Sequence, residues 1–222
     1  MIKEISKEFA LEEIKVLANN TEKFLSFQIG SLRVLDSLQF LNASLDTLVQ
    51  NLNRDGAHLF KHTAAHFPNN LNLVTRKGVY PYEYMDSPSK FTETSLPPLE
   101  KFYSKLRDES VSDEDYEHAR HVWNTLQLKN MRQYHDLYLT TDVLLLADVF
   151  ETFRGVAMDM YILDPPHFYT APGLSFNACL KYTDVKLELF TARDPNMLPF
   201  VEKGVRGGIS TIVIRYAKAN NS

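Results

Sequence analysis

The sequence lacks the features of an exported, membrane-bound or strongly basic protein. Cys179 is the one cysteine among 222 residues, so a disulfide framework within the chain is excluded and a reducing compartment is favoured. No apolar run approaches the roughly 20 residues that span a bilayer, and the segment from Met1 to Leu17 is too charged for a signal peptide. Acidic side chains outnumber basic ones by 28 to 24, which argues against a broad basic surface. These absences predict a soluble, intracellular protein with no membrane partner.

The most informative stretch runs from Tyr134 to Phe150 and predicts one long helix that continues to about Tyr161. Neither glycine nor proline interrupts it before Gly155. Apolar residues recur in it at spacings of three and four, which predicts a stripe that faces the core. The members of this stripe are Leu139, Val143, Leu146, Val149, Phe150 and Phe153.

Tyr138 and Asp142 stand four residues apart in this helix, so their side chains leave the same face. A carboxylate beside a phenol can hold a divalent metal and orient a water molecule next to it. The alternative is a helix surface with a local hydrogen bond. Asp136 and Asp148 lie six residues to either side of Asp142 and therefore on other faces of the helix.

The rest of the chain alternates short strands, helices and loops, with 44% hydrophobic residues to form a core. The patterns predict a helix end at 2–9, an antiparallel meander at 14–17, 23–29 and 32–35, helices at 44–52, 58–66, 171–181 and 195–203, and a helix that begins at Ser112. A turn at 204–208 and a strand at 209–216 follow. The 58–66 helix would place His58, His62 and His66 on one face, as a metal site or, in the simpler interpretation, a solvated face.

Two loop segments could contact nucleic acid. In the Pro-rich region from Pro68 to Pro98, Lys77 precedes Gly78 and Tyr80, a combination that could hold a phosphate and stack a base. The alternative places the lysine in a turn and packs the tyrosines on the core. The second segment is Ser37-Leu38-Gln39-Phe40-Leu41, which closes the last predicted strand.

These motifs together resemble family B DNA polymerases. Tyr138-x-x-x-Asp142 followed by Val-Leu-Leu-Leu-Ala-Asp is similar to their third exonuclease motif, most closely that of the protein-primed branch in Polinton (Maverick) transposons and linear plasmids. Ser37 to Leu41 resembles the Ser/Thr-Leu-x-x-hydrophobic motif, and Lys77 to Tyr80 resembles the Lys-x-x-hydrophobic motif. Arg206-Gly207-Gly208 resembles the Tyr-x-Gly-Gly segment, although Val205 stands where the tyrosine is expected.

The resemblance implies an α/β (α+β) fold: a truncated RNase H-like exonuclease domain with a mixed sheet flanked by helices. Residues 1–165 would belong to the 3′–5′ exonuclease domain, and residues 166–222 to its junction with the beginning of the polymerase (palm) domain. The implied catalytic residues are Tyr138 and Asp142, with Asp142 also a ligand of Mg²⁺ or Mn²⁺. The implied partners are DNA, as single strand and primer-template, and a priming terminal protein. The implied DNA contacts are Ser37, Leu38, Lys77, Tyr80, Arg206, Gly207 and Gly208.

Several motifs of that family are missing. The first exonuclease motif, Asp-x-Glu, does not occur before Ser37, and neither the second motif nor the Asp-x-x-Ser-Leu-Tyr-Pro-like palm motif occurs. Two-metal phosphoryl chemistry needs several carboxylates around cations about 4 Å apart. One aspartate and one tyrosine cannot supply them, so we expect a polymerase fragment that is inactive alone and does not hold the metal stably. The alternative is a non-catalytic mixed α/β module that binds nucleic acid or protein.

Overall fold

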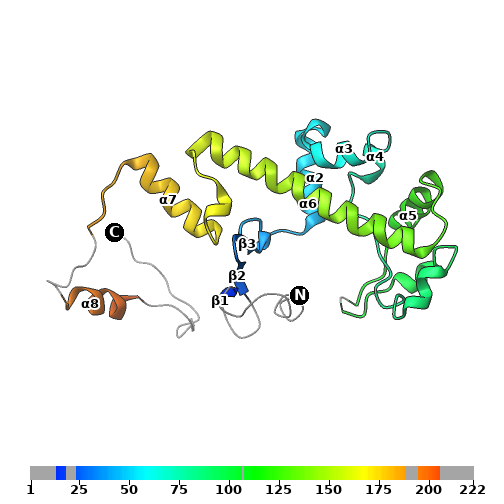
Figure 1. Cartoon of the computed structure of the whole chain (residues 1–222), viewed down its shortest axis with the longest axis horizontal. Helices are drawn as coiled ribbons and strands as arrows, with labels where there is room; N and C mark the ends of the chain where they lie inside the picture. The colour runs from blue at the N-terminus through cyan, green and yellow to red at the C-terminus, as the bar shows by residue number, and fades with distance from the viewer. Residues whose placement is uncertain (1–13, 19–23, 107, 189–194, 206–222) are drawn as a thin grey trace, which may run out of the picture. The chain divides into compact units, whose positions relative to one another are not determined.

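A single helix of 31 residues, α6 (Met131–Tyr161), is the support on which the first part of the chain packs (Figure 1). The computed structural model describes residues 14–18, 24–106, 108–188 and 195–205. The helix end predicted at 2–9 and the strand predicted at 209–216 lie outside these ranges. By its internal contacts the chain divides into two units, Met1–Tyr182 and Thr183–Ser222. The functional boundary predicted after residue 165 falls inside the first unit and stays a prediction.

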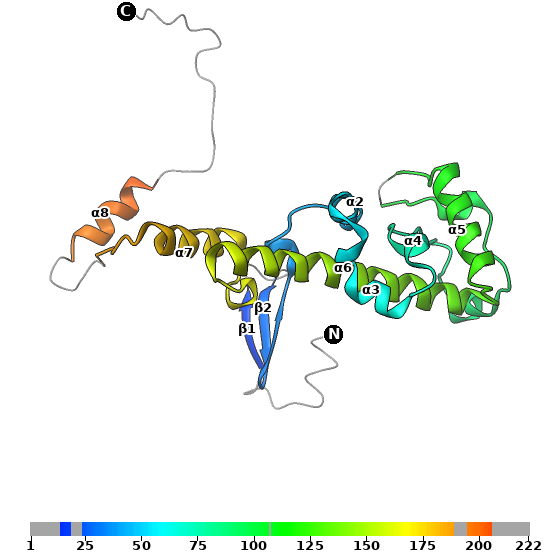
Figure 2. The ribbon, with the colours of Figure 1, turned by 90° about the horizontal axis from the view of Figure 1, so that it is seen from above.

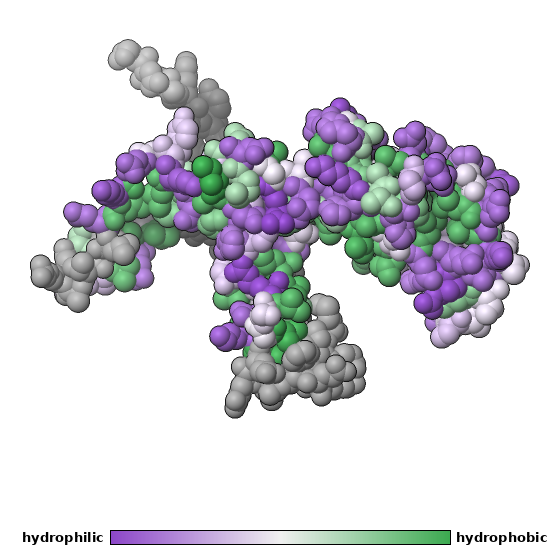
Figure 3. Space-filling model, turned by 45° about the horizontal axis from the view of Figure 1, so that its top comes forward, coloured by the Kyte–Doolittle hydropathy of each residue, from purple (hydrophilic) through white to green (hydrophobic). Residues whose placement is uncertain are grey.

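The predicted meander is confirmed. Strands β1 (Ile14–Ala18), β2 (Phe24–Ile29) and β3 (Leu32–Leu35) form a sheet in the order β1-β2-β3, with both pairs antiparallel. Gly30 has a φ of 54° in the two-residue turn between β2 and β3, a conformation that suits a tight hairpin. The predicted combination of helices and sheet is therefore present, and across the described strands the sheet is entirely antiparallel. Apolar side chains, including Leu32, remain exposed on it (Figure 3).

Most of the predicted helices of the first unit begin close to their predicted positions. Ser44 caps α2 (Leu45–Asp55) by accepting a hydrogen bond from the Thr47 N–H, and Ser112 caps α5 (Asp113–Thr125) in the same way through Asp115. Asn130 caps α6 through the Gln133 N–H. The remaining helical elements are η2 (Ser37–Gln39), η3 (Ala57–Leu59), α3 (Lys61–His66), α4 (Leu71–Val74), η4 (Pro88–Thr92), η5 (Leu99–Phe102), η6 (Pro165–His167) and α7 (Ala171–Thr183). Helix α8 (Met197–Gly204) belongs to the second unit.

Two clusters of buried side chains lie along α6. In the first, α2 and α3 cover the middle of the helix, where Leu145 is fully buried (Figure 2). In the second, the loop that contains Tyr80 and helix α5 cover the first turns of α6, where Met131 and Tyr134 are buried. Helix α6 is therefore the common support on which segments distant in the sequence pack.

The predicted core-facing stripe of α6 is wrong at two positions. Leu139 and Val143 are 55% and 58% exposed, whereas Thr141, Leu145 and Asp148 are buried. The helix has apolar side chains on several faces, so periodicity alone does not identify the face against which α2 and α3 pack. Val149 of the predicted stripe is buried as expected.

The helix predicted from His58 to His66 is confirmed only in its second half, as α3. The backbone leaves the helical region at Phe60, whose fully buried side chain enters the core, and this residue separates η3 from α3. The three histidines therefore do not lie on one continuous helix. No group of three or more histidine, cysteine or acidic side chains that could hold a metal occurs in the described part of the chain. No described helix is long and apolar enough to cross a membrane.

Candidate functional site

Tyr138 and Asp142 lie one turn apart on α6, and each affects the ionisation of the other. Burial raises the pKa of the Asp142 carboxyl above its usual range, and the nearby Lys77 ammonium and Tyr138 hydroxyl oppose this shift only in part. Burial also raises the pKa of the Tyr138 phenol, so this hydroxyl keeps its proton. Among the described residues, the Oδ1 atom of Asp142 is buried without a hydrogen-bond partner. An oxygen left in this state is available to a ligand.

The loop from Lys77 to Tyr82 is fastened along α6 by three contacts. The Tyr134 hydroxyl donates a hydrogen bond of 2.6 Å to the Val79 carbonyl. The other two contacts are hydrogen bonds between side chains. Tyr80 Oη lies 2.8 Å from His135 Nδ1, and Tyr82 Oη lies 2.9 Å from Tyr138 Oη.

Gly78 brings the loop backbone beside the Tyr138 ring. A β-carbon at Gly78 would lie 3.5 Å from Cδ2 of that ring, an ordinary van der Waals contact, so the loop passes next to the ring with no requirement for glycine. With the loop held there, the Lys77 ammonium acts electrostatically on Asp142. Four residues singled out from the sequence, Lys77, Tyr80, Tyr138 and Asp142, therefore meet at one place although about 60 positions separate the two pairs.

The two tyrosines of this loop have different environments. Tyr80 is only 9% exposed, and its ring stacks on Tyr138 at 5.0 Å and on Tyr134 at 6.3 Å between centroids. This is the core packing that the alternative interpretation described. Tyr82 is 64% exposed and meets the Tyr138 ring edge-on. Tyr82 is not among the DNA contacts predicted from the sequence, where its one signal is a second tyrosine two residues after Tyr80, separated from it by Pro81.

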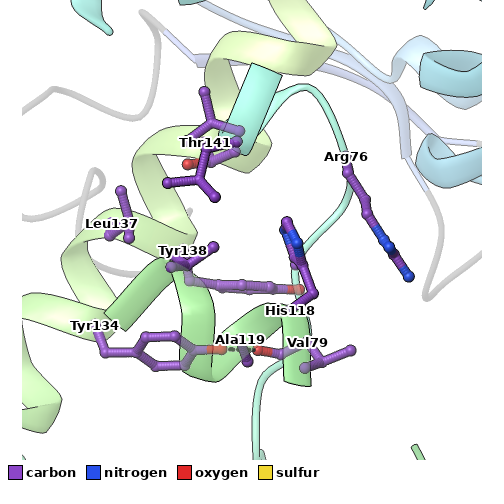
Figure 4. A pocket seen from close by; sticks show the side chains of 12 residues that line it. Arg76, Val79, His118, Ala119, Tyr134, Leu137, Tyr138 and Thr141 are labelled. Carbon is purple, nitrogen blue, oxygen red and sulfur yellow. Dashed lines mark hydrogen bonds between the residues drawn. The ribbon is translucent and has the colours of Figure 1, made fainter. Parts of the chain in front are cut away.

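A small cavity lies beside Tyr138, between α5, α6 and the segment from Leu73 to Val79 (Figure 4). Its volume of about 40 Å³ is enough for one or a few water molecules. His118 of α5, Thr141 of α6 and Leu73 are among the residues that line it. The Tyr138 ring forms part of the cavity wall. Its hydroxyl points toward the Tyr82 hydroxyl.

The other predicted contact residues lie elsewhere. Ser37 and Leu38 belong to η2 rather than to a strand, and Leu38 is 53% exposed. The neighbouring Phe40 packs on Phe150 and Phe153, about 12 Å or more along α6 from Asp142. Arg206, Gly207 and Gly208 lie outside the described residues, and Gly204 of the predicted turn is the last residue of α8.

The described residues supply one metal ligand, not a complete metal site. The partnerless Oδ1 of Asp142 suits a hard cation such as Mg²⁺, which prefers oxygen ligands. The nearest other acids on the helix have different partners: Asp136 pairs with Arg132 at 3.0 Å, and Asp148 accepts hydrogen bonds from His62 and Thr63. A two-metal centre needs several carboxylates close together, and the described residues bring no such group together.

Comparison with known proteins gives one match. The sequence model of the family described as DNA polymerase type B, organellar and viral, matches residues 1–221. No curated protein and no solved structure matches the chain. The combination of helices with a small antiparallel sheet is consistent with part of an exonuclease-like domain of such a polymerase. With nearly its whole length matched, the chain belongs to the family of organellar and viral type B DNA polymerases.

Proposed function

We propose that this chain contributes to the 3′–5′ exonuclease site of a protein-primed type B DNA polymerase, where it receives the 3′ end of a single DNA strand. The observation that carries the proposal is the partnerless Oδ1 of Asp142 beside Tyr138, on which the Lys77 ammonium of a distant loop acts electrostatically. A buried carboxylate oxygen without a hydrogen-bond partner is costly for a purely structural helix. It is expected where a ligand completes the site.

Each residue has a distinct role in this proposal. Asp142 is one ligand of Mg²⁺ or Mn²⁺, the ions that supply charge stabilisation at the scissile phosphate when they are bound. Tyr138 keeps its proton and orients the attacking water through its hydroxyl. Lys77 contacts a phosphate, and the exposed Tyr82 ring offers a surface on which a base can stack. The ring faces of Tyr80 are already covered by other aromatic rings, so its role is to stack on the Tyr138 ring and hold that ring in position.

The remaining predicted contacts extend the path of the strand. Ser37 and Leu38 contact DNA or the terminal protein further along α6, and Arg206, Gly207 and Gly208 contribute at the junction between exonuclease and palm domains. Alone, the chain neither degrades single-stranded DNA nor extends a primer, because one carboxylate and one phenol cannot hold two cations.

The test uses a polymerase of this family that contains this segment together with the other exonuclease motifs. Asp142→Ala removes a metal ligand, so exonuclease activity falls by about 100-fold or more. Tyr138→Phe removes only the hydroxyl and lowers it less. Primer extension persists in both variants, since the polymerase carboxylates are separate. Single-turnover degradation and extension assays measure these effects.

Asp136→Ala is the matched control, because this acid lies on the same helix and, among the described residues, pairs with the exposed Arg132. It leaves both activities unchanged. If Asp142→Ala instead lowers both activities equally and depresses the melting temperature, the pair is structural and the catalytic assignment is wrong. That result would favour the interpretation as a non-catalytic interaction module.

A further inference from the structure

His135, in the second turn of α6, contacts two segments that pack on this helix. Its ring lies 5.4 Å from the Tyr80 ring between centroids, and it meets the Phe91 ring of η4 edge-on at 5.1 Å. Its Nδ1 atom is the hydrogen-bond partner of the Tyr80 hydroxyl at 2.8 Å. Contacts with two rings and one hydroxyl therefore hold the imidazole in one orientation, with Nδ1 directed at the loop that contains Tyr80.

Tyr80 connects His135 to Tyr138. The Tyr80 ring stacks on the Tyr138 ring at 5.0 Å between centroids, with 28° between the ring planes. Burial raises the pKa of Tyr80, so its hydroxyl keeps its proton and remains available for the hydrogen bond with His135. Loss of that hydrogen bond would free one end of Tyr80 and shift the ring face on which Tyr138 stacks.

The placement of the Tyr138 ring decides where its hydroxyl lies. The phenol interacts with the Asp142 carboxyl, and its hydroxyl lies 2.9 Å from the Tyr82 hydroxyl. The helix fixes the backbone of Tyr138, but rotation about its side-chain bonds would carry the hydroxyl away from Asp142. Because a displacement of about 1 Å in a group that orients a reactant can change a rate about 100-fold, this ring needs a fixed support.

We propose that His135 is a positioning residue for the exonuclease reaction: through its hydrogen bond with Tyr80 it fixes the Tyr138 ring, and hence the hydroxyl that orients the attacking water. The inference rests on the proposed function and adds a residue that contacts neither the DNA nor the metal. His135 acts on the rate of bond cleavage more than on DNA affinity. The loop stays fastened without it, by the hydrogen bonds from Tyr134 to Val79 and between Tyr82 and Tyr138.

The experiment measures single-turnover degradation of single-stranded DNA by the same complete polymerase. His135→Leu keeps apolar packing against Phe91 and removes the hydrogen bond, so the rate at saturating DNA should fall about tenfold. DNA affinity should change by less than about twofold, and primer extension should persist. His135→Asn should recover most of the rate, because its amide can occupy the place of Nδ1 and bind the Tyr80 hydroxyl. His121→Leu, the same change at an exposed histidine of α5, is the matched control and leaves the rate unchanged.

Double-mutant cycles separate positioning from a general loss of stability. In Tyr138→Phe no hydroxyl remains to be placed, so His135→Leu should lower the rate no further in that variant. Tyr80→Phe removes the other partner of the same hydrogen bond, so it should match His135→Leu, and the combination should equal either one alone. Additive losses in either cycle overturn the proposal, as does a rate for His135→Asn as low as that of His135→Leu. Thermal melts verify that each variant folds.

Asp142→Ala and Tyr138→Phe, measured beside these variants, distinguish failure of this inference from failure of the proposed function. If both keep the exonuclease rate of the unmodified protein, the exonuclease role is wrong and the role of His135 falls with it. If both lose activity while His135→Leu and Tyr80→Phe keep it, the proposed function stands and the role of His135 alone is overturned.

Discussion

At the scale of single residues, Asp142 combines two properties that conflict in a structural side chain. Its carboxylate is half buried, and Oδ1 has no partner among the described residues. Lys77 and Tyr138 compensate only part of the desolvation, because the net effect is still a raised pKa. The ionised form therefore costs stability, and this cost is expected at a position kept for a ligand rather than for the fold.

The raised pKa predicts a pH-dependent gain in stability for Asp142→Asn. A carboxyl whose pKa is raised by folding contributes stability below its ordinary pKa and loses it as the pH rises through the raised value. At pH 7 the amide avoids the ionisation cost, so the melting temperature should rise by about 1–3 °C. The difference should shrink toward zero below about pH 4. Thermal melts at pH 4 and pH 7 measure it.

The control for this prediction is Asp136→Asn, whose carboxylate is exposed and paired with Arg132. It should not raise the melting temperature at pH 7. A lower melting temperature for Asp142→Asn at pH 7 would mean that Lys77 and Tyr138 stabilise the ionised carboxylate by more than its burial costs.

At the scale of secondary-structure elements, Asp148 of α6 determines how α3 begins. Its carboxylate accepts hydrogen bonds from the backbone N–H groups of His62 and Thr63, at 2.7 and 3.0 Å, and from the Thr63 hydroxyl at 2.6 Å. Phe60, the residue before α3, has no polar side chain with which to cap the helix. A carboxylate 85 positions away therefore supplies the cap and joins α3 to α6.

Asp148→Ala should destabilise the protein by about 2–4 kcal/mol, since it leaves two N–H groups and a hydroxyl without their acceptor in a buried place. Urea unfolding followed by circular dichroism measures this change. Asp136→Ala, on the same helix, removes only an exposed ion pair and should change the free energy of unfolding by about 0.5 kcal/mol or less. Equal effects of the two substitutions would show that the contact of Asp148 with α3 contributes nothing.

At the scale of the whole molecule, the net charge of −4 limits binding to DNA. Many of the described arginines already face acids: Arg76 pairs with Glu114 and Asp115, and Arg154 pairs with Glu151 and Asp164. Contact with a DNA strand therefore rests on local groups such as Lys77 rather than on a broad positive field.

The chain should bind single-stranded DNA with micromolar or weaker affinity at physiological salt, with a shallow salt dependence. Lys77→Ala should lower the slope of log K against log salt by about 0.7, the value for one lost phosphate contact on a single strand. Lys61→Ala, an exposed lysine on α3, is the control and should leave the slope unchanged. Fluorescence anisotropy over a salt series measures both, and nanomolar affinity for the unmodified chain would contradict the argument from charge.

Local features of this protein could be predicted from its sequence. The long helix α6, the serine caps of α2 and α5 and the antiparallel meander all depend on residues a few positions apart, through periodicity, capping and turns. The spacing of Tyr138 and Asp142 on one face of a helix belongs to the same class of information. So does the motif that identified the polymerase family.

The tertiary structure alone decided which faces and partners these local elements would have. Helix α6 buries Asp148 and exposes Leu139. The helix predicted at 58–66 is interrupted at Phe60. Tyr82 rather than Tyr80 is exposed beside Tyr138. Each of these outcomes depends on contacts between segments 50 or more positions apart, or on the packing of one such segment against another. Sequence periodicity does not encode such contacts, because it records the faces of an element and not the neighbour that covers each face.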